Sequence, residues 1–599
     1  MTMAGRRPGG TSFWRGDAAK AVAAMLVVAA VAAAGGFKAL AGNADNDSLL
    51  RLVEVRDLIA GQDWFDLHQY RMGTGGGFLM HWSRIVDAPI AAIILAVSAI
   101  TGSQAAGETA ALIAWPLLLY TIALYLLLRI GRRIAGEEAM FPLLIIGATT
   151  LYYTGIFEPG AIDHHNIQLV LMLAMVLFLL EANSSNRSAW LAGISAVLML
   201  AIGMETAPYV AAGGLFVAVW FLLRGREAGG AAAGFGIAFA ATSAAVFVAT
   251  VPPSQWSAAY CDAYSVVQFA IGTFAGAGLA IVAATPALNA TLPRRAGSLV
   301  VLGGAVAVLA LTYFPQCLDD PYANLGPMLQ SYWLDAVGEA QPLWRILATE
   351  PENAAGHYAT VAIALVVLGL GMRRNGVRRE DALLAAMLAV ALLVSVWQVR
   401  GSRFSLPLAC VPLAIWIAGW RRHAAAAPGV ASSLKLAGAW LVSFHVSWIL
   451  AALGIWYAFS SPEAGKELAA EKCYRQADYA QLAAMPADNV LVISNLGSSM
   501  LRHTTHRVLA GPYHRNMDGN IAVLEAFIGS PDKALEIARA NDIGLLAVCP
   551  GNSETTFLAD RAPEGLLAGL VAGKAPDWLE LVPESQDGPL SVYRVLPGS

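Results

Sequence analysis

Charged residues are scarce in this sequence. Of its 599 residues, 13% are Asp, Glu, Lys or Arg, while 57% are hydrophobic. A soluble domain carries about a quarter charged residues, so this composition excludes an ordinary soluble protein and indicates a membrane protein. The few Lys and Arg residues stand in short loop clusters and form no single basic face, which argues against nucleic acid as a partner.

The sequence contains many long apolar runs. The first follows a basic N-terminus and resembles a signal peptide, but it is longer than a usual signal core, so we interpret it as a retained helix. A shorter run, 88–101, suits either a span or a helix at the membrane surface. Thirteen runs are long enough to cross roughly 30 Å of hydrocarbon, at 19–41, 108–130, 139–156, 166–181, 189–203, 207–223, 231–251, 265–288, 298–314, 356–371, 383–398, 404–420 and 435–458.

The charge of the loops decides between the two interpretations of 88–101. If this run does not cross, the basic N-terminus and almost every Arg pair between spans lie on the cytoplasmic side, as the positive-inside rule expects. The sequence therefore predicts a multi-pass protein of the bacterial inner membrane, with membrane lipids around it and residue 599 in the periplasm. The predicted outer segments are 42–107, 157–165, 252–264, 315–355, 399–403 and the chain after 459.

The composition changes after the last span. Residues 460–599 contain short β-branched runs such as NVLVISN and LSVYRVLP, separated by segments with helical spacing. We expect an α-helical polytopic membrane domain over 1–459, with outer loops 42–107 and 315–355. A periplasmic α/β domain would follow over 460–599.

Cysteine is also rare, and its positions are uneven. Cys261, Cys317, Cys473 and Cys549 all fall in outer segments, whereas Cys410 stands inside a span. This distribution indicates an oxidising compartment. Because Cys261 and Cys317 follow two neighbouring spans at similar depth, we expect a disulfide between them.

Acidic residues and histidines gather in three outer motifs. GNADNDSLLRL carries Asp47, FEPGAIDHHN carries Asp163, His164 and His165, and MHWSRIVD carries His81. Carboxylates and imidazoles at such spacing can converge on a hard divalent cation, Mn²⁺ or Mg²⁺, that neutralises a diphosphate leaving group. Each motif alone could also merely end a helix and face water. Their combination favours a metal site.

Three further residues stand at outer positions. Arg403, in QVRGSRFSLPL, opens a span, where its guanidinium could hold phosphate oxygens bidentately or simply extend to the lipid interface. Glu350 lies in the long loop 315–355, and loops of that length without evident structure are often functional. Glu205, in GMETAPY, ends another span, and no role is assigned to it.

With these motifs in this order, the chain resembles the GT-C fold glycosyltransferases. It is most similar to the catalytic subunit of oligosaccharyltransferase and to its bacterial and archaeal single-chain forms. The resemblance implies that Asp47 represents the first acidic motif, and that Asp163 and His165 represent the second in its D-x-H form. His81 would supply a further metal ligand.

The same resemblance implies roles in binding the substrates. The segment GSRFSLPL matches the start of a late helix whose Arg contacts the lipid-linked diphosphate, which assigns Arg403, and His164 is placed with it as a substrate-binding residue. Thr349 and Glu350 match the loop motif whose Glu contacts the acceptor amide. The family's W-W-D-Y-G motif is absent, since Trp578 is the single Trp after residue 459. The acceptor therefore stays open among protein, lipid and glycan.

The predicted function is an inverting, metal-assisted glycosyltransferase that moves a sugar or oligosaccharide from a polyprenyl-phosphate or polyprenyl-diphosphate carrier to a periplasmic acceptor. Asp47 would act as both metal ligand and catalytic base. The alternative is an envelope polysaccharide or lipid transporter or flippase, which would carry ionisable residues near mid-bilayer and show inverted repeats. A non-catalytic assembly factor of the same fold is a third class.

Overall fold

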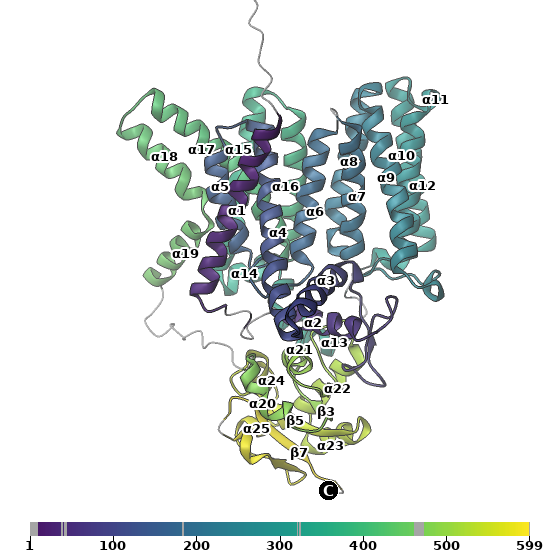
Figure 1. Cartoon of the computed structure of the whole chain (residues 1–599), viewed down its shortest axis with the longest axis vertical. Coiled ribbons are helices and arrows are strands. Elements are labelled where there is room, and N and C mark those ends of the chain that lie inside the picture. Colours follow the sequence, from purple (N-terminus) through teal and green to yellow (C-terminus); the bar gives the residue numbers. More distant parts are fainter. Residues whose placement is uncertain are drawn as a thin grey trace, which may run out of the picture.

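The computed structural model describes residues 10–37, 40, 45–182, 185–319, 322, 325–459, 473–586 and 588–597. Figure 1 shows a bundle of long helices with a small sheet domain beyond one end. The predicted fold class, a polytopic helical protein with a C-terminal α/β domain, is confirmed. The predicted first residue of that domain, 460, and the predicted end of the first span, 41, lie outside the described residues.

The predicted spans all fall on apolar helices. Ten described helices are long and apolar enough to cross a membrane; nine of them cover predicted spans, and the tenth is Arg84–Thr101. Three shorter apolar helices, Met140–Tyr153, His165–Glu181 and Asn186–Ile202, cover three more predicted spans, and the last predicted span falls on a bent pair of helices. The described part of α1 ends at Ala34, before a turn. The helices over the thirteen runs are α1 Gly10–Ala34, α4 Gln104–Ala135, α5 Met140–Tyr153, α6 His165–Glu181, α7 Asn186–Ile202, α8 Ala207–Arg224, α9 Arg226–Thr250, α10 Val266–Ala284, α12 Leu292–Tyr313, α15 Pro351–Asn375, α16 Arg379–Trp397, α17 Ser402–Ala426 and the pair α18 Val430–Ser443 and α19 His445–Phe459.

The last predicted span, 435–458, is wrong as one continuous helix. The helices α18 and α19 meet at an angle of 86°. The chain turns at Phe444, whose extended backbone (φ −98°, ψ 125°) ends the helical hydrogen bonding. Figure 1 shows this pair at the edge of the bundle.

The run 88–101 belongs to α3 (Arg84–Thr101), which by length and composition alone would qualify as a span. Figure 1 places it with α2 (Asn46–Ile59) at the end of the bundle nearest the sheet. It turns at Gly102 into α4, whose 32 residues extend about 48 Å, well beyond the hydrocarbon thickness. The α3 helix packs against α4, and the prediction that 88–101 does not cross stays a prediction.

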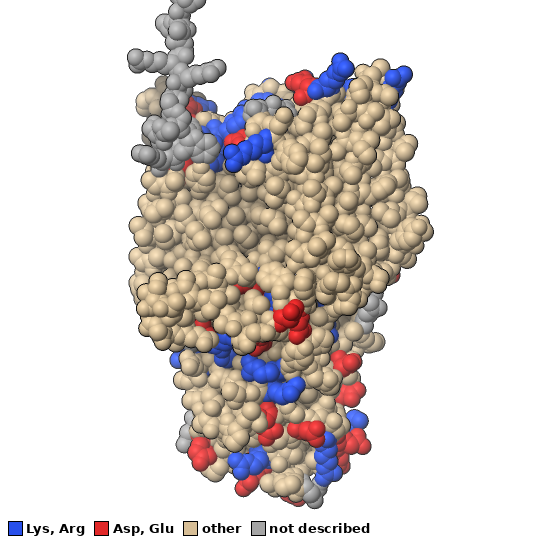
Figure 2. All heavy atoms as spheres, turned by 45° about the vertical axis from the view of Figure 1, so that its right-hand side comes forward, with Lys and Arg blue, Asp and Glu red and all other residues tan. Residues whose placement is uncertain are grey.

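Charge is segregated along the molecule. Figure 2 shows, on one face, a broad band without Lys, Arg, Asp or Glu. Basic side chains dominate the end of the bundle away from the sheet, and both signs occur at the sheet end. The basic end carries Arg pairs in the last turns of two helices, Arg132 and Arg133 in α4 and Arg373 and Arg374 in α15.

The sequence of the loop 315–355 shows no evident secondary structure, yet the loop is folded. Helices of one or two turns form by local hydrogen bonds and are too short to show a helical period in the sequence. The segment folds into the short helices η4 Pro315–Leu318, α13 Pro327–Tyr332, η5 Leu334–Ala336, η6 Gly338–Ala340 and α14 Leu343–Thr349 before α15 begins.

The C-terminal domain contains a mixed five-stranded sheet with strand order β4-β3-β5-β7-β6. The strands β3, β4 and β5 are parallel, whereas β7 runs antiparallel to β5 and β6, with Leu546 opposite Tyr593. The strands are β3 Asn489–Leu491, β4 Arg507–Val508, β5 Ile543–Val548, β6 Leu579–Leu581 and β7 Ser591–Val595, and the main helices around them are α21 Ser494–His503, α22 Met517–Ile528, α23 Pro531–Ala540, α24 Ser553–Arg561 and α25 Leu566–Val571.

The first predicted outer loop, 42–107, packs with the C-terminal domain, and the two together are called the outer unit below. Arg71 and Gly73 exchange backbone hydrogen bonds with Val508, which extends the sheet past β4. The hydrophobic core of the sheet domain also includes Met72 and Trp82 from that loop. A boundary at residue 459 therefore does not divide the packing of the molecule into two independent cores.

The loop carries a hairpin of β1 (His68–Gln69) and β2 (Phe78–Leu79). Gly77 adopts φ +110°, where a Cβ would clash with the Gln69 carbonyl, so glycine is required at this turn.

Two disulfides fasten the outer segments. The predicted bond between Cys261 and Cys317 is confirmed, with 5.1 Å between their Cα atoms. A second bond joins Cys473 and Cys549, whose Cα atoms are 6.4 Å apart. Cys410 is free and buried within α17.

Replacing Cys473 and Cys549 together by Ser should destabilise the outer unit by about 2–4 kcal/mol, because the bond closes a long loop of the unfolded chain. The two residues are 76 positions apart. Urea unfolding of the detergent-solubilised protein would measure the loss. The matched control is Cys410→Ala, which breaks no covalent link; equal midpoints for the double variant and the wild type would contradict the expectation.

Candidate functional site

A cavity of about 1600 Å³ lies where the helix bundle meets the outer unit. Its wall combines side chains from the first outer loop, the loop before α6, the loop 252–265, the segment 315–345 and the C-terminal domain. Six of the seven residues assigned from the sequence line it. They are Asp47, His81, Asp163, His164, His165 and Arg403.

One hydroxyl joins the first two acidic motifs. Asp45 caps α2 by accepting the Ser48 backbone N–H at 2.8 Å. The buried Ser48 Oγ donates to Asp45 at 3.0 Å and accepts the backbone N–H groups of Ile162 and Asp163 at 3.1 and 3.2 Å. The chain segments on either side of this contact are more than a hundred residues apart. Ser48 thus brings Asp47 to the D-H-H loop.

The D-H-H motif forms one compact cluster. The Asp163 carboxylate lies 2.5 Å from His164 Nδ1 and 3.4 Å from His165 Nε2. All three residues are buried at the cavity wall. Their nitrogen and oxygen atoms lie within 4.8 Å of one another, so they can hold a metal ion.

Glu205, which has no assigned role in the sequence analysis above, completes this cluster. It accepts from His164 Nε2 at 2.9 Å and from Gln168 Nε2 at 2.7 Å, while Gln168 also contacts His165 Nδ1 at 3.1 Å. Both ring nitrogens of His164 therefore face carboxylates. The His164 ring is therefore held between Asp163 and Glu205, and its predicted contact with the substrate stays a prediction.

The electrostatics of the two acidic motifs differ. Burial raises the pKa of Asp47 well above its ordinary value, and the carboxylates of Asp163, Glu339 and Asp45 raise it further. Burial opposes the ionised forms of Asp163 and His164 too, but their mutual attraction prevails. It holds the pKa of Asp163 well below its ordinary value and, with Glu205, raises that of His164 to about 10.

Arg84 and Asp87, from the motif MHWSRIVD, belong to a buried network of ion pairs next to the D-H-H loop. Asp87 accepts from Arg51 at 2.7 Å and from Arg84 at 3.2 Å, and Arg84 also lies 3.6 Å from Glu54. All four are nearly inaccessible to solvent. Arg51 further lies 3.3 Å from His164 Nδ1 and stacks over Trp82. This ion-pair network fixes α2 against α3 and the D-H-H loop.

Arg403 also lines the cavity. Its guanidinium is 3.1 Å from Glu339 of η6, and Arg400 is 3.8 Å from the same carboxylate. Although burial opposes ionisation, Arg403 and Arg400 hold the pKa of Glu339 below its ordinary value.

Glu350 is placed elsewhere. It is exposed at the start of α15, accepts from Asn353 at 2.6 Å, and is absent from the described wall of the large cavity. It lies along a neighbouring hollow of about 440 Å³ that also reaches Arg403 and Glu339. The motif match points to Glu350, whereas the carboxylate that contacts Arg403 at the cavity wall is that of Glu339, which no local sequence pattern singles out.

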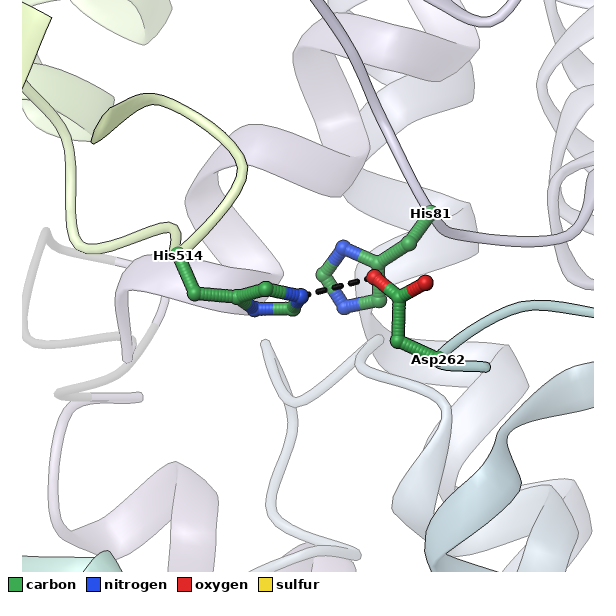
Figure 3. Close-up of side chains that lie close together, drawn as sticks. All are labelled: His81, Asp262 and His514. Carbon is green, nitrogen blue, oxygen red and sulfur yellow. Dashed lines mark hydrogen bonds and ion pairs between the residues drawn. The ribbon is translucent and has the colours of Figure 1, made fainter. Parts of the chain in front are cut away.

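His81 belongs to a separate group. Figure 3 shows it beside His514 and Asp262, which come from the C-terminal domain and the loop 252–265. Asp262 accepts from His514 at 2.7 Å and is held by both ends of the Arg515 guanidinium at 2.7 Å. Burial and the neighbouring His514 lower the pKa of His81 well below its usual value.

The arrangement of these elements has a known counterpart. The structure of AglB, the archaeal oligosaccharyltransferase from Archaeoglobus fulgidus, in complex with an inhibitory peptide and a dolichol-phosphate, matches with a TM-score of 0.62 over 94% of this chain and 73% of that one. This chain has an oligosaccharyltransferase-like GT-C fold. The fold-level resemblance predicted from the motifs is confirmed.

Two further structures of the Archaeoglobus fulgidus oligosaccharyltransferase agree. The apo form gives a TM-score of 0.59 over 88% of this chain and 69% of that one. The form tethered by a disulfide to an acceptor peptide containing the NVT sequon gives 0.60 over 96% and 74%. Sequence identities are 12–13%. No protein-family model matches the sequence, and no curated protein matches it.

Ser48→Ala should loosen the acidic site. The substitution removes the acceptor of two buried backbone N–H groups. Each donor left unsatisfied costs about 1–3 kcal/mol of stability. We expect a lower unfolding midpoint and faster hydrogen exchange at residues 161–164, measured by mass spectrometry. Ser98→Ala is the matched control, because the Ser98 hydroxyl has no partner among the described residues. Unchanged exchange in Ser48→Ala would refute the role given to this hydroxyl.

Proposed function

We propose that this protein is a membrane glycosyltransferase that transfers a sugar or oligosaccharide from a polyprenyl-phosphate or polyprenyl-diphosphate carrier to a periplasmic acceptor, with inversion at the anomeric carbon. One observation carries the proposal. Two acidic motifs more than a hundred residues apart meet in a cavity at the end of a membrane bundle with an oligosaccharyltransferase-like fold. The related archaeal enzyme has been solved with a dolichol-phosphate, a lipid phosphate of the kind proposed here.

The residues around Asp47 and Asp163 suit a divalent cation. Asp47 carries a carboxylate destabilised by neighbouring carboxylates, and no described side chain donates a hydrogen bond to it. The buried Asn46 Oδ1 beside it also lacks a partner among the described residues. Asp47, Asp163 and His165 supply oxygen and nitrogen donors appropriate for Mn²⁺ or Mg²⁺. Such an ion would neutralise charge on the departing phosphate.

The protein's own groups divide the remaining work. Asp47, at the cavity wall, would accept a hydrogen bond or proton from the acceptor nucleophile as that atom approaches the anomeric carbon. His164, fixed between Asp163 and Glu205, holds the Asp163 carboxylate in one orientation. The sugar–phosphate bond breaks as the new glycosidic bond forms on the opposite face, which inverts the anomeric centre.

Arg403 and Glu339 would handle the two substrates. The Arg403 guanidinium can exchange its contact with Glu339 for phosphate oxygens, a bidentate arrangement that guanidinium favours. Glu339, released at the cavity wall, is then better placed than the exposed Glu350 to meet the acceptor. The acceptor can be a protein, a lipid or a growing glycan.

A transporter or flippase is the competing class. Such proteins bind at the bilayer midplane, between discontinuous helices. Asp47 and Asp163 instead come from α2 and from the loop before α6, and Figure 1 shows α2 at the end of the bundle nearest the sheet domain. The geometry therefore favours transfer chemistry.

Asp47→Ala and Asp163→Ala should each lower sugar transfer by about 10²–10³, the scale of losing one electrostatic stabiliser. Both proteins should still reach the membrane, because neither carboxylate belongs to the helix packing. Mass spectrometry of envelope lipids and glycans would compare a deletion strain complemented with each variant. Isolated membranes should lose activity in EDTA and regain it with Mn²⁺ or Mg²⁺.

Glu350→Gln and Glu339→Gln supply the matched pair for this experiment. Glu339→Gln should reduce transfer, whereas Glu350→Gln should retain it. Full transfer in EDTA and in both Asp variants would refute the metal site, and accumulation of an untransferred glycolipid on the inner leaflet alone would favour a flippase.

The orientation is a separate proposal. The basic end of the bundle should face the cytoplasm and the sheet domain the periplasm of a bacterial inner membrane. Alkaline phosphatase fused after residue 599 should therefore be active, while a reporter that matures only in the cytoplasm should stay dark at the same position. The reverse pattern would overturn both the orientation and the periplasmic acceptor.

A further inference from the structure

Three chain segments meet at the cluster of His81, Asp262 and His514. His81 follows the first outer hairpin, Asp262 directly follows the disulfide-bonded Cys261, and His514 lies in the C-terminal domain. Figure 3 shows the two imidazoles and the carboxylate converging on one another. All three line the large cavity.

The donor atoms of this cluster lie close enough together to converge on one metal ion. The candidate donor atoms lie within 4.8 Å of one another. The two imidazole rings are 4.6 Å apart between centroids and tilted by 53°, so they form neither a stack nor a hydrogen bond. The buried Nδ1 of His81 has no hydrogen-bond partner among the described residues. A buried acceptor or donor left in this way is rare unless something else binds it.

We propose that His81, Asp262 and His514 form a second metal site, distinct from the acidic cluster, that takes a divalent transition metal of the zinc type. A site of two imidazoles and one carboxylate favours Zn²⁺ over Mg²⁺, which prefers oxygen ligands. Ligand atoms bound to tetrahedral Zn²⁺ lie about 3.3–3.5 Å apart, so small side-chain rotations would close the site. The fourth position faces the cavity and would hold water.

Arg515 is compatible with this site. Its guanidinium grips both oxygens of Asp262, and it also stacks on the Tyr260 ring, 4.9 Å from the ring centroid. A ligating carboxylate is commonly held by such an outer hydrogen bond, which fixes its orientation. Binding would replace the present hydrogen bond between His514 and Asp262 with two bonds to the metal.

The site is separate from the one around Asp163. The donor atoms of Asp163, His164 and His165 form their own group, and His81 is not a member of it. Trp82 stands next to both, since it neighbours His81 in the chain and its ring lies 6.1 Å from that of His164. A metal at His81 would therefore latch the first outer loop, the disulfide-bonded loop and the C-terminal domain together at the rim of the cavity.

The test uses the full chain in detergent, stripped with EDTA and titrated with Zn²⁺ or Co²⁺. The background is Asp163→Ala, which removes the acidic cluster as a competitor. We expect one Zn²⁺ per chain by elemental analysis, the visible absorption of Co²⁺ in a tetrahedral site, and a higher melting temperature with Zn²⁺. Adding His81→Gln should weaken binding by about 100-fold or more, since even loss of an outer-shell partner costs 10–100-fold, and should abolish the thermal shift.

His81→Gln is the decisive variant because it leaves the Asp262–His514 hydrogen bond intact, so the metal-free protein should melt as its parent does. His68→Gln, which removes a histidine from the same outer loop away from the cluster, is the matched control and should bind normally. Undiminished Zn²⁺ binding in the His81→Gln protein would overturn the proposal. Complete loss of Zn²⁺ in Asp163→Ala alone would also overturn it, because a single shared site would then explain all binding.

Discussion

Hydrocarbon offers no partner for an ionised side chain, and this constraint governs where the protein can carry its chemistry. The long helices keep the central band free of charge on the face seen in Figure 2. The ionisable clusters collect around the cavity between the bundle and the sheet domain, at the end where Figure 1 shows α2 and α3. A carboxylate such as Asp163 can therefore be buried and ionised at once, because His164 and His165 stand against it.

Buried charge at this end is paired almost throughout, and the pairing gives the site its rigidity. Arg51, Arg84 and Asp87 are nearly inaccessible, and each has an opposite charge within reach. Such a network is weak evidence for stability, since desolvation opposes the attraction, but its geometry is restrictive. It fixes the start of α2 beside the D-H-H loop. Asp47 is the exception, a carboxylate surrounded by others.

The outer unit closes the cavity from the other side. Arg71 donates to carbonyls at the end of α21, Arg56 to the Arg502 carbonyl, and Tyr513 to the Asn46 carbonyl beside the acidic motif. The C-terminal domain thus reaches the first turn of α2 directly. Asp262 receives Arg515 from the same domain, and the adjacent Cys261 ties that loop to the segment carrying Glu339. The Cys261–Cys317 disulfide and the Arg515–Asp262 ion pair thus lie next to each other at the cavity wall.

Local patterns in the sequence suffice to predict the helical spans, the α/β character of the C-terminal segment and the disulfide at Cys261. They also single out Asp47, Asp163, His165 and Arg403, which line the cavity. Each of these follows from a local pattern: an apolar run, an alternation, or a short motif. The tertiary structure alone decided that Ser48 joins the acidic motifs, that Glu205 orients His164, that Glu339 rather than Glu350 meets Arg403, and that His81 lies with His514. These contacts join residues tens to hundreds of positions apart, and no local periodicity records which distant loops packing will bring together.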